Sequence, residues 1–138
     1  MPFDPAERRQ TDRERQRFWA EFAARHPRPR LAWGNTYARW RDVPGTELVV
    51  SYNIARRGVG VFVRGQRGLP VAETAAQLAR FSLEIRLGCA MGNPGFPFLS
   101  WSRLDMLEEA NWPAGHDWLA AAGERYVAAL AAVVGGLE

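Results

Sequence analysis

Strict alternation of apolar residues over Leu48 to Val63 restricts the fold of this chain more than any other feature of its sequence. The alternate positions hold Leu48, Val50, Tyr52 and Ile54, then Val59, Val61 and Val63. A period of two indicates strands with one buried face. Between the two runs, Arg56-Arg57-Gly58 forms a short connection in which Gly58 is free to adopt positive φ. The pattern therefore predicts an antiparallel hairpin of residues 47–55 and 58–64.

Three segments have the periodicity and the end signals of helices. Two capping boxes, Asp4 to Glu7 and Thr11 to Glu14, predict a helix that begins near one of them and ends before Pro27. Apolar residues at helical spacing predict two further helices, over residues 70–87 and 113–134. We expect these two helices to cover the hairpin and to bury Leu78, Phe81, Ile85, Leu119, Tyr126 and Leu130.

Two weaker patterns complete the predicted sheet. Residues 36–41 and 98–103 read as additional strands, separated from their neighbours by segments rich in glycine and proline. We therefore predict an α+β fold with an N-terminal helix, an antiparallel meander of about four strands, and two further helices packed on the sheet. The absence of repeats, low-complexity tracts and linkers predicts one domain over residues 1–138.

The inventory of reactive side chains argues against most catalytic chemistry. One cysteine and two distant histidines cannot build a zinc site, and without a lysine the chain has no Schiff-base or phosphate-loop lysine. His116-Asp117 near Ser100 or Ser102 is the one pairing that could serve nucleophilic catalysis, and Glu84 is the other candidate for a small enzyme. Scattered acids leave little basis for a carboxylate-bound Mg²⁺. We expect no catalytic residues, no metal and no cofactor.

Composition also bears on the environment of the protein. The longest apolar stretch, residues 127–134, is far shorter than the roughly 20 residues that span a bilayer, and Asp4 and Glu7 precede arginines where a secretion signal would be apolar. A single cysteine, Cys89, suits a reducing compartment. These features predict a cytoplasmic protein that does not contact membranes, and the exclusive use of arginine is typical of a GC-rich, bacterial genome.

Positive charge is concentrated in the first half of the chain. Fourteen arginines against seven acids give +7 over residues 1–67, whereas four arginines against eight acids give −4 over residues 68–138. Such asymmetry favours a polyanionic partner or a complementary protein surface. Arginines interleaved with aromatic residues can contact phosphates while the rings stack on bases. The candidate nucleic-acid-binding residues are Arg39, Trp40, Arg56, Arg57, Arg64 and Arg67.

Several short motifs resemble a known family. They are Phe18-Trp19-Ala20-Glu21-Phe22, the hairpin from Leu48 to Val63, the segment from Phe81 to Gly88, Leu99-Ser100-Trp101, and Asn111-Trp112 with Trp118-Leu119. Together they resemble the domain of unknown function that often follows a PD-(D/E)XK-type nuclease domain in restriction-like and defence-associated proteins. The resemblance implies an α-β-β-β-α-β-α domain without established catalytic residues. The nuclease motif, which ends in a lysine, does not occur in this sequence.

Three functions are open at this point. The preferred one is a non-catalytic accessory domain that binds DNA or RNA through its basic N-terminal half, or binds a nuclease or another nucleic-acid-handling protein. The second is a protein-interaction or oligomerisation module, for example a homodimer, that uses the arginine-rich first helix and exposed tryptophans. The third is a small enzyme centred on His116 or Glu84.

Overall fold

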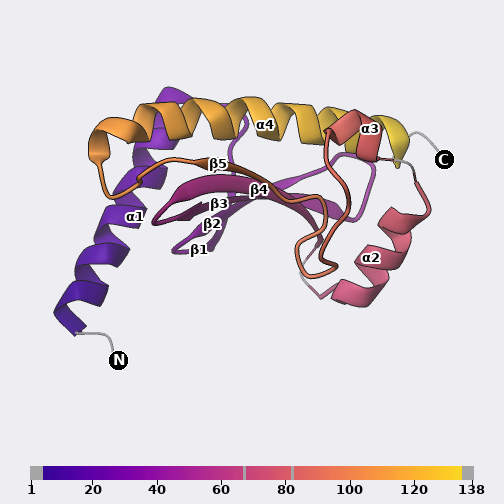
Figure 1. Ribbon diagram of the computed structural model, residues 1–138, viewed down its shortest axis with the longest axis horizontal. Helices are drawn as coiled ribbons and strands as arrows, with labels where there is room; N and C mark the ends of the chain where they lie inside the picture. The colour runs from indigo at the N-terminus through magenta and orange to yellow at the C-terminus, as the bar shows by residue number, and fades with distance from the viewer. Residues whose placement is uncertain (1–4, 67, 82, 135–138) are drawn as a thin grey trace.

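The computed structural model describes residues 5–66, 68–81 and 83–134 (Figure 1). Its elements follow one another in the order α1 (Pro5–Arg25), β1 (Ala32–Asn35), β2 (Ala38–Asp42), β3 (Leu48–Ala55), β4 (Gly58–Gly65), α2 (Val71–Ala79), α3 (Glu84–Leu87), β5 (Ser100–Arg103), the 3-10 turn η1 (Glu109–Asn111) and α4 (Trp112–Val133). The predicted α+β class is confirmed, with five strands rather than four.

The sheet is a continuous antiparallel meander in which the strands lie in sequence order, β1-β2-β3-β4-β5. The predicted hairpin is confirmed: β3 pairs with β4 from Leu48↔Gly65 to Ala55↔Gly58, with Arg56 and Arg57 in the turn. The β1–β2 turn lies at the same end of the sheet, because β2 runs antiparallel to β3. That end, with Tyr37, Arg56 and Arg57, is called the hairpin end below.

Helices cover one face of the sheet. In Figure 1, α4 runs along the sheet over its whole length, α1 descends past one end, and α2 and α3 lie at the other. The covered face supplies alternate strand residues to a core that also includes Phe18 and Phe22 of α1 and Leu119 and Tyr126 of α4. The opposite face, which we call the open face, carries no helix among the described residues.

A close approach between α4 and the central strand fixes the position of this layer. A Cβ atom on Gly123 would overlap the phenol ring of Tyr52, so only glycine lets the ring lie against the helix backbone. The approach at Gly115, two turns earlier, is looser, since a Cβ atom there would lie 3.1 Å from the end of the Met106 side chain and 3.4 Å from Val59. Tyr126, on the same helix, donates a 2.6 Å hydrogen bond from its hydroxyl to the carbonyl oxygen of Phe98. The helix is therefore held both against β3 and against the segment that precedes β5.

The prediction of one helix over residues 70–87 was wrong. The chain forms two separate elements, α2, which ends at Ala79, and the single turn α3, which begins at Glu84. Leu78 and Leu83 are both fully buried, although positions five apart on one α-helix point about 140° away from each other. The interruption lets both side chains enter the same core. Phe81 is half-buried rather than buried, and the side chain of Ile85 lies outside the described residues.

The boundaries of the outer strands also differ from expectation. Thr36 and Tyr37 form a turn, so β2 begins two residues later than predicted. Phe98 adopts a left-handed φ of 56°, a conformation that a strand cannot continue through, so β5 begins only at Ser100. The short β1 was not predicted, since Ala32–Asn35 lacks alternation and contains Gly34. The predicted end signals Asp4 and Gly135-Gly136 lie outside the described residues.

The contact of Tyr52 with Gly123 can be tested by substitution. We expect Gly123→Ala to lower the free energy of unfolding by about 1–3 kcal/mol, as overpacked cores do, although alanine is the better helix former by about 1 kcal/mol. Tyr52→Phe in the same background should recover part of the loss, because the hydroxyl is the atom closest to the new methyl group. Urea unfolding of both single variants and the double variant measures this coupling. A Gly123→Ala protein as stable as the wild type would contradict the packing described.

Candidate nucleic-acid interface

The strand register assigns side chains to the two faces of the sheet. Trp40, Ser51 and Phe62 lie opposite one another on β2, β3 and β4, on the open face. The next row of the same face pairs Asn53 with Gly60, and Gly60 with Trp101. The open face thus carries aromatic rings on three strands.

Trp101 lies across β4 on the open face. A Cβ atom on Gly58 would lie 2.6 Å from the indole nitrogen of Trp101, and one on Gly60 would overlap the six-membered ring. A side chain at either position would clash with the indole. The backbone of Gly58 and Gly60 therefore forms a flat shelf under the ring. The ring rests on this shelf with 43% of the residue exposed. Arg103, two residues further along β5, is exposed on the same face.

Trp40 and Arg64 form a stacked pair on the same face. The Arg64 guanidinium carbon lies 4.2 Å from the centroid of the Trp40 ring, within the range of a cation–π interaction. The Arg64 Nε also donates to the carbonyl oxygen of Gly65 at 3.3 Å. Within the described residues Arg64 forms no ion pair. Its terminal nitrogens are therefore oriented by neighbours that do not neutralise their charge.

Further aromatic surface lies beside this pair. Phe62 meets Phe96 edge-to-face, with ring centroids 5.3 Å apart, and Phe96 is 51% exposed. Asp42, two residues after Trp40 on β2, also points to the open face. The face is thus aromatic and mainly basic, with an acid at its margin.

Positive side chains gather at the hairpin end. Arg56 and Arg57 are exposed, and their carbonyl oxygens accept hydrogen bonds from the amides of Met106 and Leu104, which anchor the turn. Together with Arg103 they line a shallow hollow next to Asp105. Arg15 of α1 is buried at the same end, and both its burial and the nearby charge of Arg56 lower its pKa. The turn thus presents several arginines on a backbone that is hydrogen-bonded to the segment after β5.

Ion pairs remove much of the charge asymmetry that the sequence shows. Acids of the second half neutralise arginines of the first half on the helical side: Glu109 pairs with Arg17, Asp117 with Arg25 and Glu124 with Arg41. In the described part of the chain, Arg56, Arg57, Arg64 and Arg103 have no such acidic partner. These four arginines therefore bring positive charge without an acidic partner to the hairpin end and the open face.

The predicted site residues separate into three groups. Trp40 and Arg64 meet on the open face, and Arg56 and Arg57 lie at the hairpin end. Arg39 points to the opposite face, where its guanidinium stacks on Trp19 at 5.2 Å and donates to the carbonyl oxygen of Asn35 at 2.6 Å; burial lowers its pKa. Arg67 lies outside the described residues.

Sequence reasoning missed Phe62, Phe96, Trp101 and Arg103. A signal for Trp101 was present, because Gly58 and Gly60 alternate with buried valines and so mark a strand face without side chains. Which ring fills that space is a long-range contact, and no local pattern reveals it.

The alternative catalytic groups do not form a reactive arrangement. His116 is buried, and its Nε2 donates to the carbonyl oxygen of Phe18 at 3.0 Å. Asp117 instead binds Arg25 and His26, and those hydrogen bonds lower its pKa. The Ser100 hydroxyl lies 2.7 Å from the Tyr126 hydroxyl, and Glu84 is exposed at the start of α3. Residues 5–66, 68–81 and 83–134 contain no group of three His, Cys, Asp or Glu placed to hold a metal ion.

Comparisons with protein families, with curated proteins and with solved structures find no match to this chain. None of the helices in the described ranges has the length and apolar character needed to cross a bilayer.

The buried His116 should make stability depend on pH. Burial is the largest cause that lowers its pKa, Arg25 and His26 lower it further, and the Phe18 carbonyl and Glu21 oppose the shift. Between the unfolded pKa of about 6.5 and the lower folded value, only the unfolded chain binds the proton, so stability falls as pH decreases. Urea unfolding from pH 8 to pH 5 should show this fall, and His116→Gln, which can still donate to Phe18, should reduce it. Equal slopes in both proteins would assign the proton to another group.

Proposed function

We propose that this chain is a non-catalytic accessory domain that binds single-stranded nucleic acid through the open face and the hairpin end. The observation that carries the proposal is the union of two features on one surface. Exposed rings lie on a sheet face without helices, and the arginines around them have no acidic partners within the described residues.

The aromatic rings favour single strands over duplexes. A ring such as Trp101, which lies on the sheet with one side toward solvent, can stack only on a base whose plane is exposed. Each base–aromatic stack contributes about 1–3 kcal/mol and depends little on base identity. Trp101, Phe62 and Phe96 lie within one surface, so several successive bases have stacking partners.

The arginines support a path for the phosphates. Arg56, Arg57 and Arg103 lie at the hairpin end, and Arg64 lies across the sheet beside Trp40. A strand that passes from the hairpin end over Trp101 toward Arg64 meets positive charge at both ends of its track. Contacts of this kind position the strand and carry little sequence information.

A second candidate uses the same surface for a protein. Tyr37, Phe96, Leu99 and Trp101 are exposed, and aromatic residues and arginine are enriched at protein interfaces. Such a partner is a nuclease, as the family resemblance suggests, or a second copy of this chain. The two candidates differ in their dependence on salt, because phosphate contacts release counterions.

Charge reversal at the hairpin end tests nucleic-acid binding. Arg56→Glu/Arg57→Glu should weaken the binding of an oligothymidylate, and it should reduce the slope of log affinity against log salt by about 0.7 for each lost phosphate contact. The matched control is Arg86→Glu/Arg125→Glu, which changes the net charge equally but on α3 and α4. Fluorescence anisotropy at several salt concentrations measures both quantities. Equal losses in the two double variants would mean that net charge, not this surface, determines binding.

Removal of the exposed indole tests stacking. Trp101→Ala should weaken oligothymidylate binding by about 1–3 kcal/mol and leave the salt slope unchanged, because no phosphate contact is lost. Sedimentation of the wild type without nucleic acid tests the second candidate. A stable dimer that Trp101→Ala dissociates, together with no oligonucleotide binding at low salt, would replace the proposed function by homodimerisation.

A further inference from the structure

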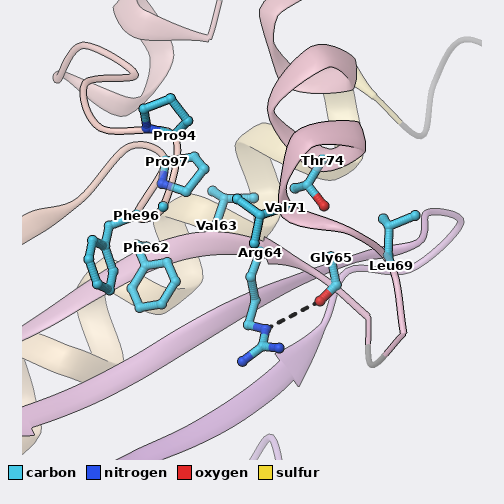
Figure 2. Close-up of a pocket in the computed structure, with 11 residues that line it drawn as sticks. Phe62, Val63, Arg64, Gly65, Leu69, Val71, Thr74, Pro94, Phe96 and Pro97 are labelled. Atoms are coloured by element: carbon cyan, nitrogen blue, oxygen red, sulfur yellow. Dashed lines mark hydrogen bonds between the residues drawn. The ribbon is translucent and has the colours of Figure 1, made fainter.

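A pocket opens at the edge of the sheet where the open face meets α2. Figure 2 shows its two walls: Phe62, Phe96, Pro94 and Pro97 stand on one side, and Val71 and Thr74 of α2 on the other. The last residues of β4 form its floor. The cavity measures about 230 Å³. Within the described residues, its lining contains no acid.

The late start of β5, at Ser100, creates this space. β5 pairs with β4 only from Gly58↔Arg103 to Val61↔Ser100, so residues 62–65 have no neighbouring strand on that side. The loop before β5 contributes one contact there, the hydrogen bond from the Val63 amide to the carbonyl oxygen of Pro97 at 2.9 Å. On the other side, a Cβ atom on Gly65 would lie 2.5 Å from the Thr74 hydroxyl, so glycine lets α2 approach. The pocket is thus built by the backbone rather than left by a missing side chain.

The size of the pocket limits its occupant. Sites for drug-sized ligands and cofactors measure about 300–1,000 Å³, so this cavity suits one small ring system rather than an extended molecule. Aromatic and proline walls favour a flat, apolar group. Backbone polar groups alternate in direction along a strand, and Val63 turns its amide toward Pro97. Gly65 therefore turns its own amide toward the same edge, where it can meet the polar rim of such a ring, whereas its carbonyl oxygen accepts from Arg64 Nε.

The pocket is continuous with the open face. Phe62 and Arg64 belong to both, and in Figure 2 the Arg64 side chain leaves the pocket floor and points away from it. Its guanidinium stacks on Trp40. A group in the pocket therefore lies beside the start of the Arg64 side chain, and an anion attached to that group can extend along it to the guanidinium, which has no acidic partner in the described part of the chain. The pocket favours a flat ring, Arg64 favours an anion next to that ring, and the open face is proposed to hold the nucleic-acid strand. A base and its phosphate in that strand have both properties.

We propose that this pocket holds one unstacked base of the bound single strand, while the phosphate next to that base contacts Arg64. The inference rests on the proposed function and deepens it, because the walls of the pocket would fix the position of one base of the strand. Strands would then bind with one fixed register relative to the sheet, in addition to the tolerant stacking on Trp101.

An abasic scan tests the fixed register. In a series of short oligothymidylates, each labelled at one end with a fluorophore, a single abasic site is moved from one position to the next. For the wild type, one position should lower affinity by about 5- to 150-fold, the range expected for one base contact, and more than its neighbours do. Val71→Phe should fill the pocket, since Val71 is 58% exposed and has room to enlarge without disturbing the core. This variant should bind the intact strand weakly and lose the sensitivity at that position.

The controls separate the pocket from the face. Ala76→Phe makes a similar change at an exposed position of α2 outside the pocket lining and should bind like the wild type. Thermal unfolding checks that both variants fold. If strands bind but the scan is flat, or if Val71→Phe binds like Ala76→Phe, the pocket inference fails and the proposed function stands.

A second measurement addresses the pocket without a strand. Mononucleotides added at millimolar concentration should shift the amide resonances of Gly65 and Thr74 in the wild type and not in Val71→Phe. If strands do not bind at low salt, the proposed function fails. The mononucleotide shifts then decide whether the pocket takes a base at all, and their absence would overturn the inference as well.

Discussion

The close packing of α4 on the central strands is the constraint on which the remaining structure depends. Gly123 lets the Tyr52 ring lie against the helix backbone, and the Tyr126 hydroxyl binds the carbonyl oxygen of Phe98. The first contact sets the distance between helix and sheet, and the second fixes the segment before β5. The long helix α4 covers this face and α1 completes the core beside it. The alternate apolar residues of the strands are therefore buried there. The opposite face is left to a different use.

The open face contains residues that do not contribute to the core. Gly58 and Gly60 weaken a strand, since glycine loses more conformational entropy on folding than other residues and contributes no side chain. In return they accommodate the Trp101 indole across β4. A solvated sheet face is normally lined by polar side chains, so a wide ring held in a glycine recess with much of its surface exposed is not explained by stability alone. Under the proposed function, the exposed side of this ring is the side on which a base stacks.

The parts of the fold that depend on local pattern could be predicted, and those that depend on distant contacts could not. The alternation from Leu48 to Val63 specified the hairpin and its register, because a shift by one residue would turn every valine out of the core. The interruption between α2 and α3 depends on the burial of both Leu78 and Leu83. The late start of β5 depends on the left-handed conformation of Phe98 and on its hydrogen bond to Tyr126. For the candidate site, the sequence predicted Arg56, Arg57, Arg64 and Trp40. It also predicted Arg39, but alternation along β2 places Arg39 and Trp40 on opposite faces of the sheet.

The distribution of charge shows why the sequence alone misleads about where a polyanion would bind. The first helix is the most arginine-rich segment, yet Arg17 and Arg25 pair with Glu109 and Asp117, and β2 loses the charge of Arg41 to Glu124 in the same way. Each pair links the basic half of the chain to the acidic half, so part of the charge asymmetry is neutralised where α1 and the sheet contact η1 and α4. Among the described arginines that have no ion pair, Arg56, Arg57, Arg64 and Arg103 flank the exposed aromatic rings. The interface that we propose uses both the arginines and the rings, and it therefore lies on the sheet and its hairpin rather than on the helix with the most arginines.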